Sequence, residues 1–249
     1  MKTSFPYISV IIPVHNEERR LSWCLEQLVP FLSNTYHSWE IVVVNNGSTD
    51  ATREILEVYT NTFYKVYALH LKTRGKGLAV THGMLYARGR YRYMCDVDLS
   101  TPVEEIPRFL QAIKDADVVC GSRELDRAST QTTPLRRFMG RCFHAFVGDL
   151  AGGLQDTQCG FKMFRDFAAM DIFENIQTRG MAFDVEVIYL AKLYGLRVAE
   201  MPVKWTHNAD SRVRLWDGVL FTNDVLNIPW LHMYDGLRSV SASKQSQKP

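Results

Sequence analysis

The chain has 249 residues, of which 46% are hydrophobic and 22% charged, and its formal net charge is +2. This profile is that of an ordinary folded protein, and the length suits one large α/β domain rather than a repetitive or disordered chain. The nearly balanced charge excludes a bulk electrostatic attraction to nucleic acid, so we expect no nucleic-acid partner.

The first half of the chain alternates between strand and helix patterns. Continuous apolar runs, typical of buried parallel strands, occupy residues 7–13, 41–44, 66–71, 91–95 and 117–121. Helices are expected between them, the first opening at Asn16, the second passing through Leu56, the third covering 76–88 and the fourth opening at Thr101. This alternation predicts an α/β fold with a mostly parallel sheet flanked by helices on both faces.

Capping residues set the expected helix starts. Asn16 is followed by two acids, which favour the first turn of a helix. Asp50 suits an N-cap as well as it suits a ligand contact. Thr101, Pro102 and Glu104 occupy the N-cap, first and third positions of a predicted helix. The sequence thus predicts helices that begin close to the ends of the preceding strands.

The second half of the chain is less regular. We expect helices over 134–150, 183–194 and 215–234, the last interrupted at Pro229, and strands over 157–165 and 196–205. No linker separates the two halves, so residues 1–238 are interpreted as one domain with a C-terminal elaboration. The polar residues 239–249 are expected to form a disordered tail.

The cysteine pattern and the lack of long apolar runs indicate the cellular compartment of the protein. Five cysteines are present, and no two have the spacing of a zinc or redox motif. Cys95 and Cys120 lie in apolar runs and are expected to be buried, which favours a reducing compartment. No window supplies the roughly 20 apolar residues that span a bilayer, and no signal peptide is visible. We expect a cytoplasmic protein that does not cross a membrane.

Two carboxylates follow the strand predicted over 91–95. Asp96 and Asp98 are two residues apart, so their side chains share one face at the carboxyl edge of the sheet. Neighbouring carboxylates repel unless a cation lies between them, and Mg²⁺ or Mn²⁺ carrying nucleotide phosphates suits such oxygen ligands. A solvated acidic pair at a strand end is the alternative for so short a motif.

Phosphate binding through a glycine-rich loop after the first strand is excluded. Residues 13–18 contain no glycine, so neither a dinucleotide-binding loop nor a P-loop is present. Lys76 instead lies between Gly75 and Gly77 at a predicted helix start, where backbone N–H groups, the helix dipole and the ammonium would favour a diphosphate. A solvated turn lysine is the alternative for this position.

Seven short motifs follow one another along the chain: residues 10–18 (VIIPVHNEE), 46–50 (NGSTD), 74–77 (RGKG), 96–98 (DVD), 121–123 (GSR), 156–162 (DTQCGFK) and 183–186 (FDVE). Together they resemble the family 2 glycosyltransferases with a GT-A fold, in the polyprenyl-phosphate branch closest to the dolichyl-phosphate β-glucosyltransferases. The resemblance implies a Rossmann-like nucleotide-sugar half over 7–123 and an acceptor half over 124–238.

The same resemblance implies an inverting transfer of a hexose, glucose from UDP-glucose, to a polyprenyl or dolichyl phosphate, with Mg²⁺ or Mn²⁺ as cofactor. The metal would be held by Asp98 and Asp96, and the catalytic residues would be Asp98, Asp156, Asp184 and Arg123. The nucleotide sugar would contact Pro13, His15, Glu17, Asn46, Lys76, Asp96, Gln158, Gly160 and Arg212. Because a phosphate nucleophile is already ionised, positioning and electrostatic stabilisation would supply most of the catalysis.

A basic and aromatic segment suits a lipid phosphate acceptor. The acceptor phosphate would be bound by Arg123, Arg136, Arg137 and Arg141, because the guanidinium fork matches phosphate oxygens. Aromatic residues in the helix predicted over 134–150 suit a membrane interface, so we expect peripheral attachment to the cytoplasmic face of a membrane. A core-packing helix with a solvated basic face is the alternative.

Two departures from the family pattern leave other functions open. Asn45 and Asn46 stand where the family usually has an aspartate pair, which alters contacts to the base. Ser100 stands where the mannosyl branch tends to carry glutamine, which favours glucose. The alternatives are mannosyl transfer from GDP-mannose, transfer to a soluble sugar or protein with Asp184 or Asp156 as general base, and a nucleotide-sugar sensor without catalysis.

Overall fold

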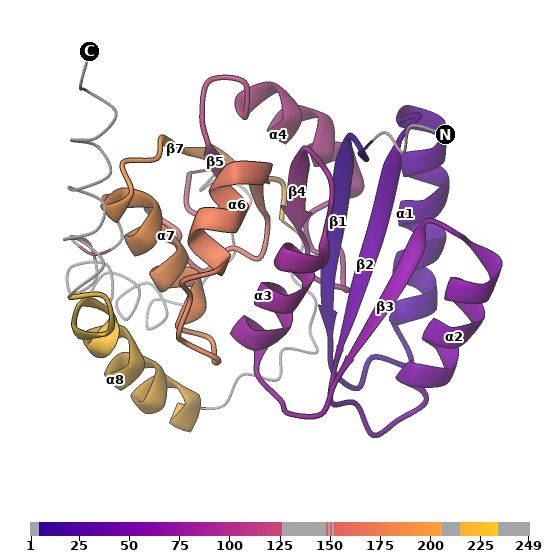
Figure 1. Cartoon of the computed structure of the whole chain (residues 1–249), viewed down its shortest axis with the longest axis horizontal. Helices are drawn as coiled ribbons and strands as arrows, with labels where there is room; N and C mark the ends of the chain where they lie inside the picture. Colours follow the sequence, from indigo (N-terminus) through magenta and orange to yellow (C-terminus); the bar gives the residue numbers. More distant parts are fainter. Residues whose placement is uncertain (1–4, 126–147, 149, 151, 206–214, 234–249) are drawn as a thin grey trace, which may run out of the picture.

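The computed structural model describes residues 5–125, 148, 150, 152–205 and 215–233, without the side chains of 215–220. Within them, seven strands form one sheet in the order β3-β2-β1-β4-β6-β5-β7 (Figure 1). The strands are β1 (Ile8–Val14), β2 (Trp39–Asn46), β3 (Val66–Leu71), β4 (Tyr91–Met94), β5 (Val118–Ser122), β6 (Lys162–Arg165) and β7 (Val198–Pro202). Each strand overlaps one of the predicted strands, so the predicted alternation is confirmed.

The sheet is mostly parallel, as predicted. β1 pairs in parallel with β2 and β4, β2 pairs with β3, and β5 pairs with β7. β6 is antiparallel to both of its neighbours, β4 and β5. Because β6 runs in the opposite direction, the residues that precede it lie at the carboxyl ends of β4 and β5. Segment 156–160 therefore lies at the sheet edge where α/β folds bind ligands.

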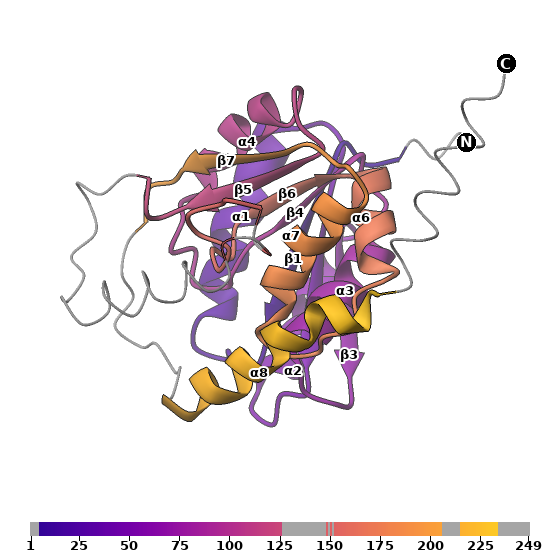
Figure 2. The ribbon, with the colours of Figure 1, turned by 90° about the vertical axis from the view of Figure 1, so that its left-hand side faces the viewer.

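Helices cover both faces of the sheet (Figures 1 and 2). The helices are α1 (Leu21–Thr35), α2 (Thr52–Thr62), α3 (Lys76–Tyr86), η1 (Val103–Glu105, a 3₁₀ helix), α4 (Ile106–Ala112), α6 (Asp166–Phe173), α7 (Phe183–Leu193) and α8 (Leu215–Leu231). α1, α2 and α4 pack on the face that includes Val10 and Ile12, whereas α3, α6 and α7 pack on the face that includes Ile11. Successive β1 residues enter opposite cores because side chains alternate along a strand. α8 packs on α7.

α1 begins at Leu21, so the helix start predicted at Asn16 is wrong. Asn16 has a positive φ of 55°, its N–H donates to Ser48 Oγ at 2.9 Å, and its Oδ1 accepts the Thr49 N–H at 2.8 Å. These contacts hold residues 16–20 as a turn against the loop after β2. A tertiary constraint therefore overrides the local preference of the acids that follow Asn16 for a helix start.

Three other predicted details of the helices can be compared with the structure. Thr101 is buried and is not an N-cap, because η1 begins two residues later at Val103. Asp50 Oδ1 accepts the Thr52 N–H at 3.1 Å, but the N-cap of α2 is Ala51, so Asp50 lies one residue before the predicted capping position. α8 continues past Pro229 without the predicted interruption. α6 has no counterpart among the predicted helices.

Some predicted features lie outside the described residues. They include most of the helix predicted over 134–150 and the tail over 239–249. Cys95 and Cys120 are buried free thiols, as predicted, and burial raises the pKa of Cys120 to about 12. Among the helices that the structure describes, none has both the length and the apolar character needed to cross a bilayer.

Candidate active site

Loops from several strands meet the N-terminus of α3 at the carboxyl edge of the sheet (Figure 1). Lys76 Nζ lies 3.0 Å from Asp96 Oδ1, which joins the start of α3 to the end of β4. The Leu78 N–H donates to the Arg179 carbonyl at 3.3 Å, which joins α3 to the segment before α7. Residues far apart in the sequence thus form one continuous surface at this edge.

Asp96 and Asp98 follow β4 and differ in their partners. Burial acts to raise the pKa of Asp96, but the charge and hydrogen bond of Lys76 outweigh it and leave this pKa below its ordinary value. Asp98 Oδ1 accepts the Ser100 N–H at 3.0 Å, and within the described part of the chain Asp98 has no ion pair. Leu99, which lies between Asp98 and Ser100, has a positive φ of 44°, a strained backbone conformation for leucine. Of the two carboxylates, Asp98 is therefore the one available to a cation.

Gly160 lies directly against the Asp96 carboxylate. A Cβ at this position would overlap Asp96 Oδ2 and would lie 2.6 Å from Asp96 Cγ. The segment before β6 therefore touches the residue that follows β4, and only glycine leaves room for this approach. The close neighbour of Gly160 in the structure is thus Asp96, and the contact of Gly160 with a sugar stays a prediction.

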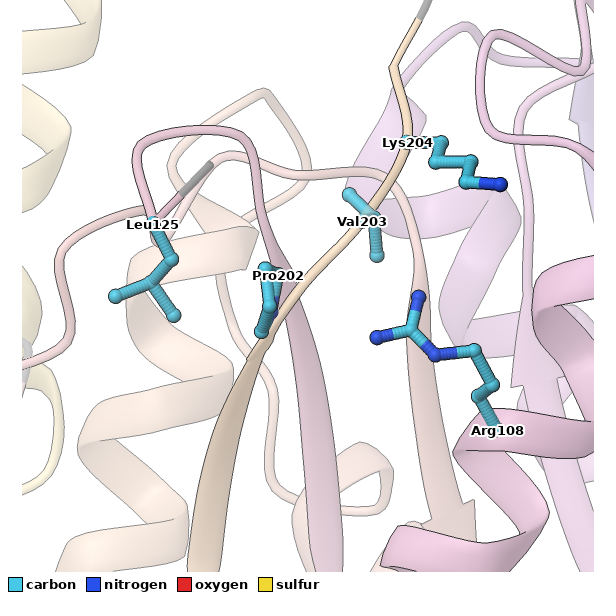
Figure 3. Close-up of a pocket in the computed structure, with 5 residues that line it drawn as sticks. All are labelled: Arg108, Leu125, Pro202, Val203 and Lys204. Atoms are coloured by element: carbon cyan, nitrogen blue, oxygen red, sulfur yellow. The ribbon is translucent and has the colours of Figure 1, made fainter. Parts of the chain in front are cut away.

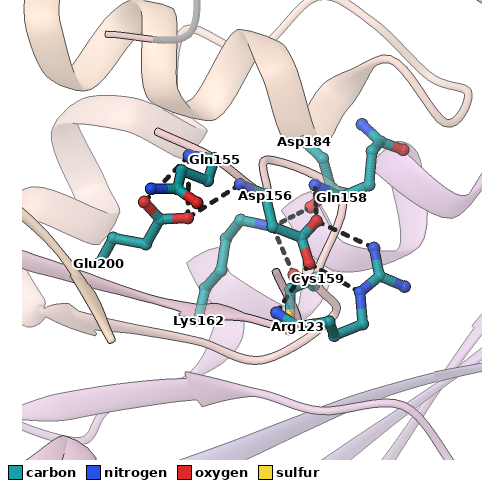
Figure 4. A network of polar contacts seen from close by, with 8 residues as sticks. All are labelled: Arg123, Gln155, Asp156, Gln158, Cys159, Lys162, Asp184 and Glu200. Atoms are coloured by element: carbon teal, nitrogen blue, oxygen red, sulfur yellow. Dashed lines mark hydrogen bonds and ion pairs between the residues drawn. The ribbon is translucent and has the colours of Figure 1, made fainter. Parts of the chain in front are cut away.

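Arg123, just after β5, is held by Asp156 (Figure 4). Arg123 Nε and Nη2 donate to Asp156 Oδ2 and Oδ1 at 2.7 and 2.9 Å, and the Arg123 N–H donates to Oδ2 at 3.1 Å. Burial opposes the charge of both groups, but their contact lowers the pKa of Asp156 and raises that of Arg123. The guanidinium carbon lies 5.8 Å from the ring centroid of Trp205. Arg123 is thus a fixed cation at the sheet edge.

Glu200 on β7 supports Asp156 from the opposite side (Figure 4). Its carboxylate accepts the Gln155 N–H at 2.9 and 3.0 Å and the Asp156 N–H at 2.8 Å. Asp156 Oδ1 in turn accepts the Gln158 N–H at 3.1 Å. These bonds fix the turn that carries Asp156. Sequence reasoning missed Glu200 because it lies outside every motif and meets the turn only through tertiary structure.

A buried ion pair joins β6 to α7. The Lys162 and Asp184 side chains are 0% and 1% exposed, and Lys162 Nζ lies 2.5 Å from Asp184 Oδ1. Lys162 Nζ also donates to the Cys159 carbonyl at 2.6 Å. Burial raises the pKa of Asp184, and the charges of Lys162 and Lys76 oppose that rise. The sequence analysis named Asp184 as a site residue but missed Lys162, although Lys162 closes one of the quoted motifs.

Two buried polar atoms near this pair have no hydrogen-bond partner among the residues that the structure describes. They are Asp184 Oδ2, an acceptor, and Gln158 Nε2, a donor. Buried polar atoms are normally paired, so each of these is suited to a ligand. A hydroxyl group both donates and accepts, which makes a sugar a chemically appropriate partner for them.

The residues predicted to contact the nucleotide form a bonded framework after β1 and β2. His15 Nδ1 lies 2.9 Å from the Asn46 carbonyl oxygen. Asn46 Oδ1 accepts the Gly75 N–H at 2.8 Å, so this side chain supports the start of α3. Glu17 Oε2 lies 2.7 Å from Arg20 Nε. The loop that precedes α1 is therefore fixed in place beside the diphosphate position proposed for Lys76.

The structure brings most of the predicted site residues to this end of the sheet. They are Pro13, His15, Glu17, Asn46, Lys76, Asp96, Asp98, Arg123, Asp156, Gln158, Gly160 and Asp184. Arg136, Arg137, Arg141 and Arg212 lie outside the described residues. Of the residues predicted to bind the acceptor phosphate, Arg123 is therefore the one within the described part of the chain.

A cavity of about 360 Å³ lies beside the ends of β5 and β7 (Figure 3). It is lined by Arg108, Leu125, Pro202, Val203 and Lys204. None of these belongs to the predicted site, and Arg108 is already paired with Glu105. The lining of this cavity therefore includes none of the carboxylates and cations described above.

The site suits a divalent cation held jointly with phosphate. Mg²⁺ is usually bound through one or two carboxylates together with substrate phosphates. Asp98 offers such a carboxylate, whereas Asp96 already has Lys76 as its cation. Among the described residues, no group of three or more His, Cys, Asp or Glu side chains could hold a metal alone. The donor set therefore fits a metal that arrives with a diphosphate.

Comparison with known proteins assigns the chain to a family. The family model described as glycosyl transferase family 2 matches residues 9–173. A Trichomonas vaginalis protein named dolichyl-phosphate beta-glucosyltransferase ALG5C is 35% identical over 238 residues, covering 89% of this chain and 70% of the relative. A Homo sapiens protein named dolichyl-phosphate beta-glucosyltransferase is 32% identical over 240 residues, covering 89% of this chain and 74% of the relative.

Solved structures share the fold at low sequence identity. Glucosyl-3-phosphoglycerate synthase from Mycobacterium tuberculosis in complex with UDP has a TM-score of 0.65 at 14% identity, over 92% of this chain and 79% of that one. The complex of that enzyme with Mn²⁺ and UDP-glucose has a TM-score of 0.64 at 15% identity, over 90% of this chain and 77% of that one. These likenesses concern the GT-A fold alone. By its sequence, the chain belongs to glycosyl transferase family 2, in the group of dolichyl-phosphate β-glucosyltransferases.

Proposed function

We propose that this protein transfers glucose from UDP-glucose to the phosphate of a dolichyl-type lipid, with inversion at the anomeric carbon. The proposal rests on one observation: Asp98, Lys76 and Arg123, each held by a described partner, lie at the same edge of the sheet. This edge combines groups suited to a metal-bound diphosphate with a fixed cation for a second phosphate. The names of the relatives support glucose as the sugar and dolichyl phosphate as the acceptor.

In the proposed reaction, an oxygen of the lipid phosphate attacks the anomeric carbon, and the bond from that carbon to the UDP oxygen breaks. The nucleophile is already ionised, so the site needs no strong general base. Arg123, fixed by Asp156, would hold the acceptor phosphate and reduce its repulsion from the donor diphosphate. Arg136, Arg137 and Arg141 are proposed to assist from the acceptor half on the basis of the sequence resemblance.

On the donor side, the N-terminus of α3 and Lys76 are proposed to bind the diphosphate. Arg212 is proposed to add charge there, again from the sequence resemblance. A divalent metal held by Asp98, when bound, offsets charge on the leaving diphosphate. Complexes of the structural neighbour with Mn²⁺ and UDP-glucose support such a cofactor. Asp184 Oδ2 and Gln158 Nε2 are proposed to bind sugar hydroxyls.

A lipid acceptor places the reaction at a membrane surface. We propose peripheral attachment on the cytoplasmic side, where thiols stay reduced. The described cysteines Cys24, Cys95, Cys120 and Cys159 are all free and buried, which suits that compartment. The membrane surface and the lipid phosphate are thus the proposed partners, together with the nucleotide-sugar donor.

A donor screen tests the proposed function. UDP-glucose, UDP-galactose, UDP-GlcNAc and GDP-mannose are compared with Mg²⁺ or Mn²⁺ and a short polyprenyl phosphate, and release of the nucleoside diphosphate is measured. We expect release from UDP-glucose that requires the lipid phosphate, with the unphosphorylated polyprenol as a matched control. Preference for GDP-mannose would overturn the sugar assignment, and release that ignores the lipid would point to a soluble acceptor.

Gly160→Ala is expected to lower kcat/KM for the donor by about 10- to 100-fold. A shift of about one ångström in a residue that positions the reacting groups can slow a reaction to this extent. The added methyl group would overlap the Asp96 carboxylate and force it to shift from the position in which it pairs with Lys76. Gly180→Ala is the matched control, since a Cβ there would lie 3.7 Å from its nearest neighbour, Asp224 Oδ2. Equal rates for the two variants would show that the position of Asp96 does not matter for turnover.

A further inference from the structure

Helix α8 and the turn after it carry apolar side chains on two opposite faces. Val225 and Ile228 on one face are buried against the start of α7. On the other side, Leu226, Trp230 and Met233 are 47%, 72% and 51% exposed. Their i, i+4, i+7 spacing places them on a single face, here called the outer face of α8. A group of large exposed apolar side chains on one face indicates an interaction surface, whereas single ones do not.

Side-chain contacts fix α8, so its outer face keeps one orientation. His232 Nε2 lies 2.6 Å from Glu186 Oε1, and both side chains are fully buried. Gln177 Nε2 donates to the Leu231 carbonyl at 3.1 Å. Glu186 also accepts the N–H groups of Gln177 and Thr178, each at 2.8 Å. The outer face is therefore part of the folded domain and is held relative to α7.

Helix α8 lies at the end of the molecule that holds the site. In both views α8 lies at the lower end, toward which β3 runs (Figures 1 and 2). The segment that contacts α8 through Gln177 continues to Arg179, whose carbonyl accepts the Leu78 N–H of α3. Lys72, Arg74 and Arg179 are exposed around this junction, and together they are called the basic rim. The helix that carries the outer face is thus joined, through residues 177–179, to the start of α3 next to the basic rim.

We propose that the outer face of α8 and the basic rim dock on the surface of an anionic lipid bilayer. The proposal rests on the proposed function, because a lipid acceptor requires the enzyme to work at a bilayer. Tryptophan favours the boundary between water and lipid, and an amphipathic helix lies there in the membrane plane. Exposed lysine and arginine are attracted by anionic headgroups. Docking through this end brings the sheet edge toward the phosphate of a membrane-embedded acceptor.

Vesicle co-sedimentation tests this docking surface with the full chain. Binding is measured on phosphatidylcholine vesicles alone and on vesicles that also contain phosphatidylserine, with no acceptor present. The triple variant Leu226→Ser, Trp230→Ser, Met233→Ser is expected to lower the bound fraction on mixed vesicles by about tenfold or more. Tyr64→Ser is the matched control, because Tyr64 is 83% exposed and precedes β3, at the opposite end of that strand. Trp230→Ser alone provides a milder variant, and thermal unfolding checks that each variant folds.

The outcomes separate the docking surface from the proposed reaction. The double variant Arg74→Gln, Arg179→Gln is expected to lose most of the preference for vesicles that contain phosphatidylserine. The triple variant is expected to turn over a detergent-dispersed short acceptor within about twofold of the wild-type rate. Equal vesicle binding by wild type and the folded triple variant would overturn the docking surface. A change in oligomeric state with no vesicle binding by wild type would also overturn it and assign the face to a second copy of the chain. Vesicle binding through this face without turnover of any lipid phosphate would retain the docking surface and reject the reaction.

Discussion

Lys162→Met is expected to lower the free energy of unfolding by about 3–5 kcal/mol, because the change leaves a buried carboxylate without its cation. Lys162 and Asp184 are 0% and 1% exposed, and Lys162 Nζ lies 2.5 Å from Asp184 Oδ1. The same ammonium donates to the Cys159 carbonyl, so the variant also leaves a buried acceptor unpaired. Urea unfolding followed by circular dichroism measures the loss.

The dependence of this loss on pH identifies its cause. Burial raises the pKa of Asp184, Lys162 opposes the rise, and loss of Lys162 therefore raises that pKa further. A carboxyl whose pKa is higher in the folded state than in the unfolded state favours folding only while it is protonated, so stability falls as pH rises. The deficit of Lys162→Met should be smaller near about pH 4 than at neutral pH and should grow as pH rises, above a part that does not depend on pH and comes from the unpaired Cys159 carbonyl.

The double variant Lys162→Met, Asp184→Asn is the matched control for this prediction. It removes the buried negative charge as well as the positive one, so it should recover much of the lost stability at neutral pH. Its stability relative to wild type should also depend little on pH. A Lys162→Met variant that is as stable as wild type, or a deficit that shrinks as pH rises, would show that this pair does not carry the expected charge energy.

The comparison of sequence with structure separates local signals from tertiary ones. The strand pattern and the spacing of Asp96 and Asp98 sufficed to predict the sheet and the edge at which these carboxylates lie. The start of α1 was predicted wrongly because the contacts of Asn16 with Ser48 depend on the loop after β2. Local capping preferences amount to about 1 kcal/mol, which several tertiary hydrogen bonds exceed.

The supporting residues of the site were the hardest to predict. Glu200 acts through backbone N–H groups of a distant turn, and no local pattern marks such an acceptor. Lys162 is buried with Asp184, although lysine is almost never fully buried unless paired. The resemblance to family motifs predicted Asp156 and Asp184 as site residues, but it did not predict the partners that fix their charge and orientation. Those partners could be identified only after β5, β6, β7 and α7 were placed side by side.

Asp98→Asn is expected to reduce turnover by about 10³-fold, which corresponds to several kcal/mol of lost stabilisation of the leaving diphosphate. The change keeps the size of the side chain and the acceptor for the Ser100 N–H but removes the negative charge that suits a divalent cation. Release of UDP from UDP-glucose is measured with polyprenyl phosphate over a series of Mn²⁺ concentrations. Calorimetric binding of UDP with and without Mn²⁺ provides a second readout that does not depend on turnover.

Asp96→Asn and Asp115→Asn complete this test. They distinguish loss of metal binding from the general effect of removing a negative charge. Asp115 is exposed in the turn that leads to the amino end of β5, so its replacement should leave turnover and Mn²⁺ dependence unchanged. Asp96→Asn removes the partner of Lys76, so it should weaken turnover without abolishing the Mn²⁺-dependent increase in UDP affinity. Asp98→Asn should abolish that increase. If instead Asp96→Asn abolishes it and Asp98→Asn does not, Asp96 is the metal ligand, and Lys76 must leave Asp96 when the donor binds.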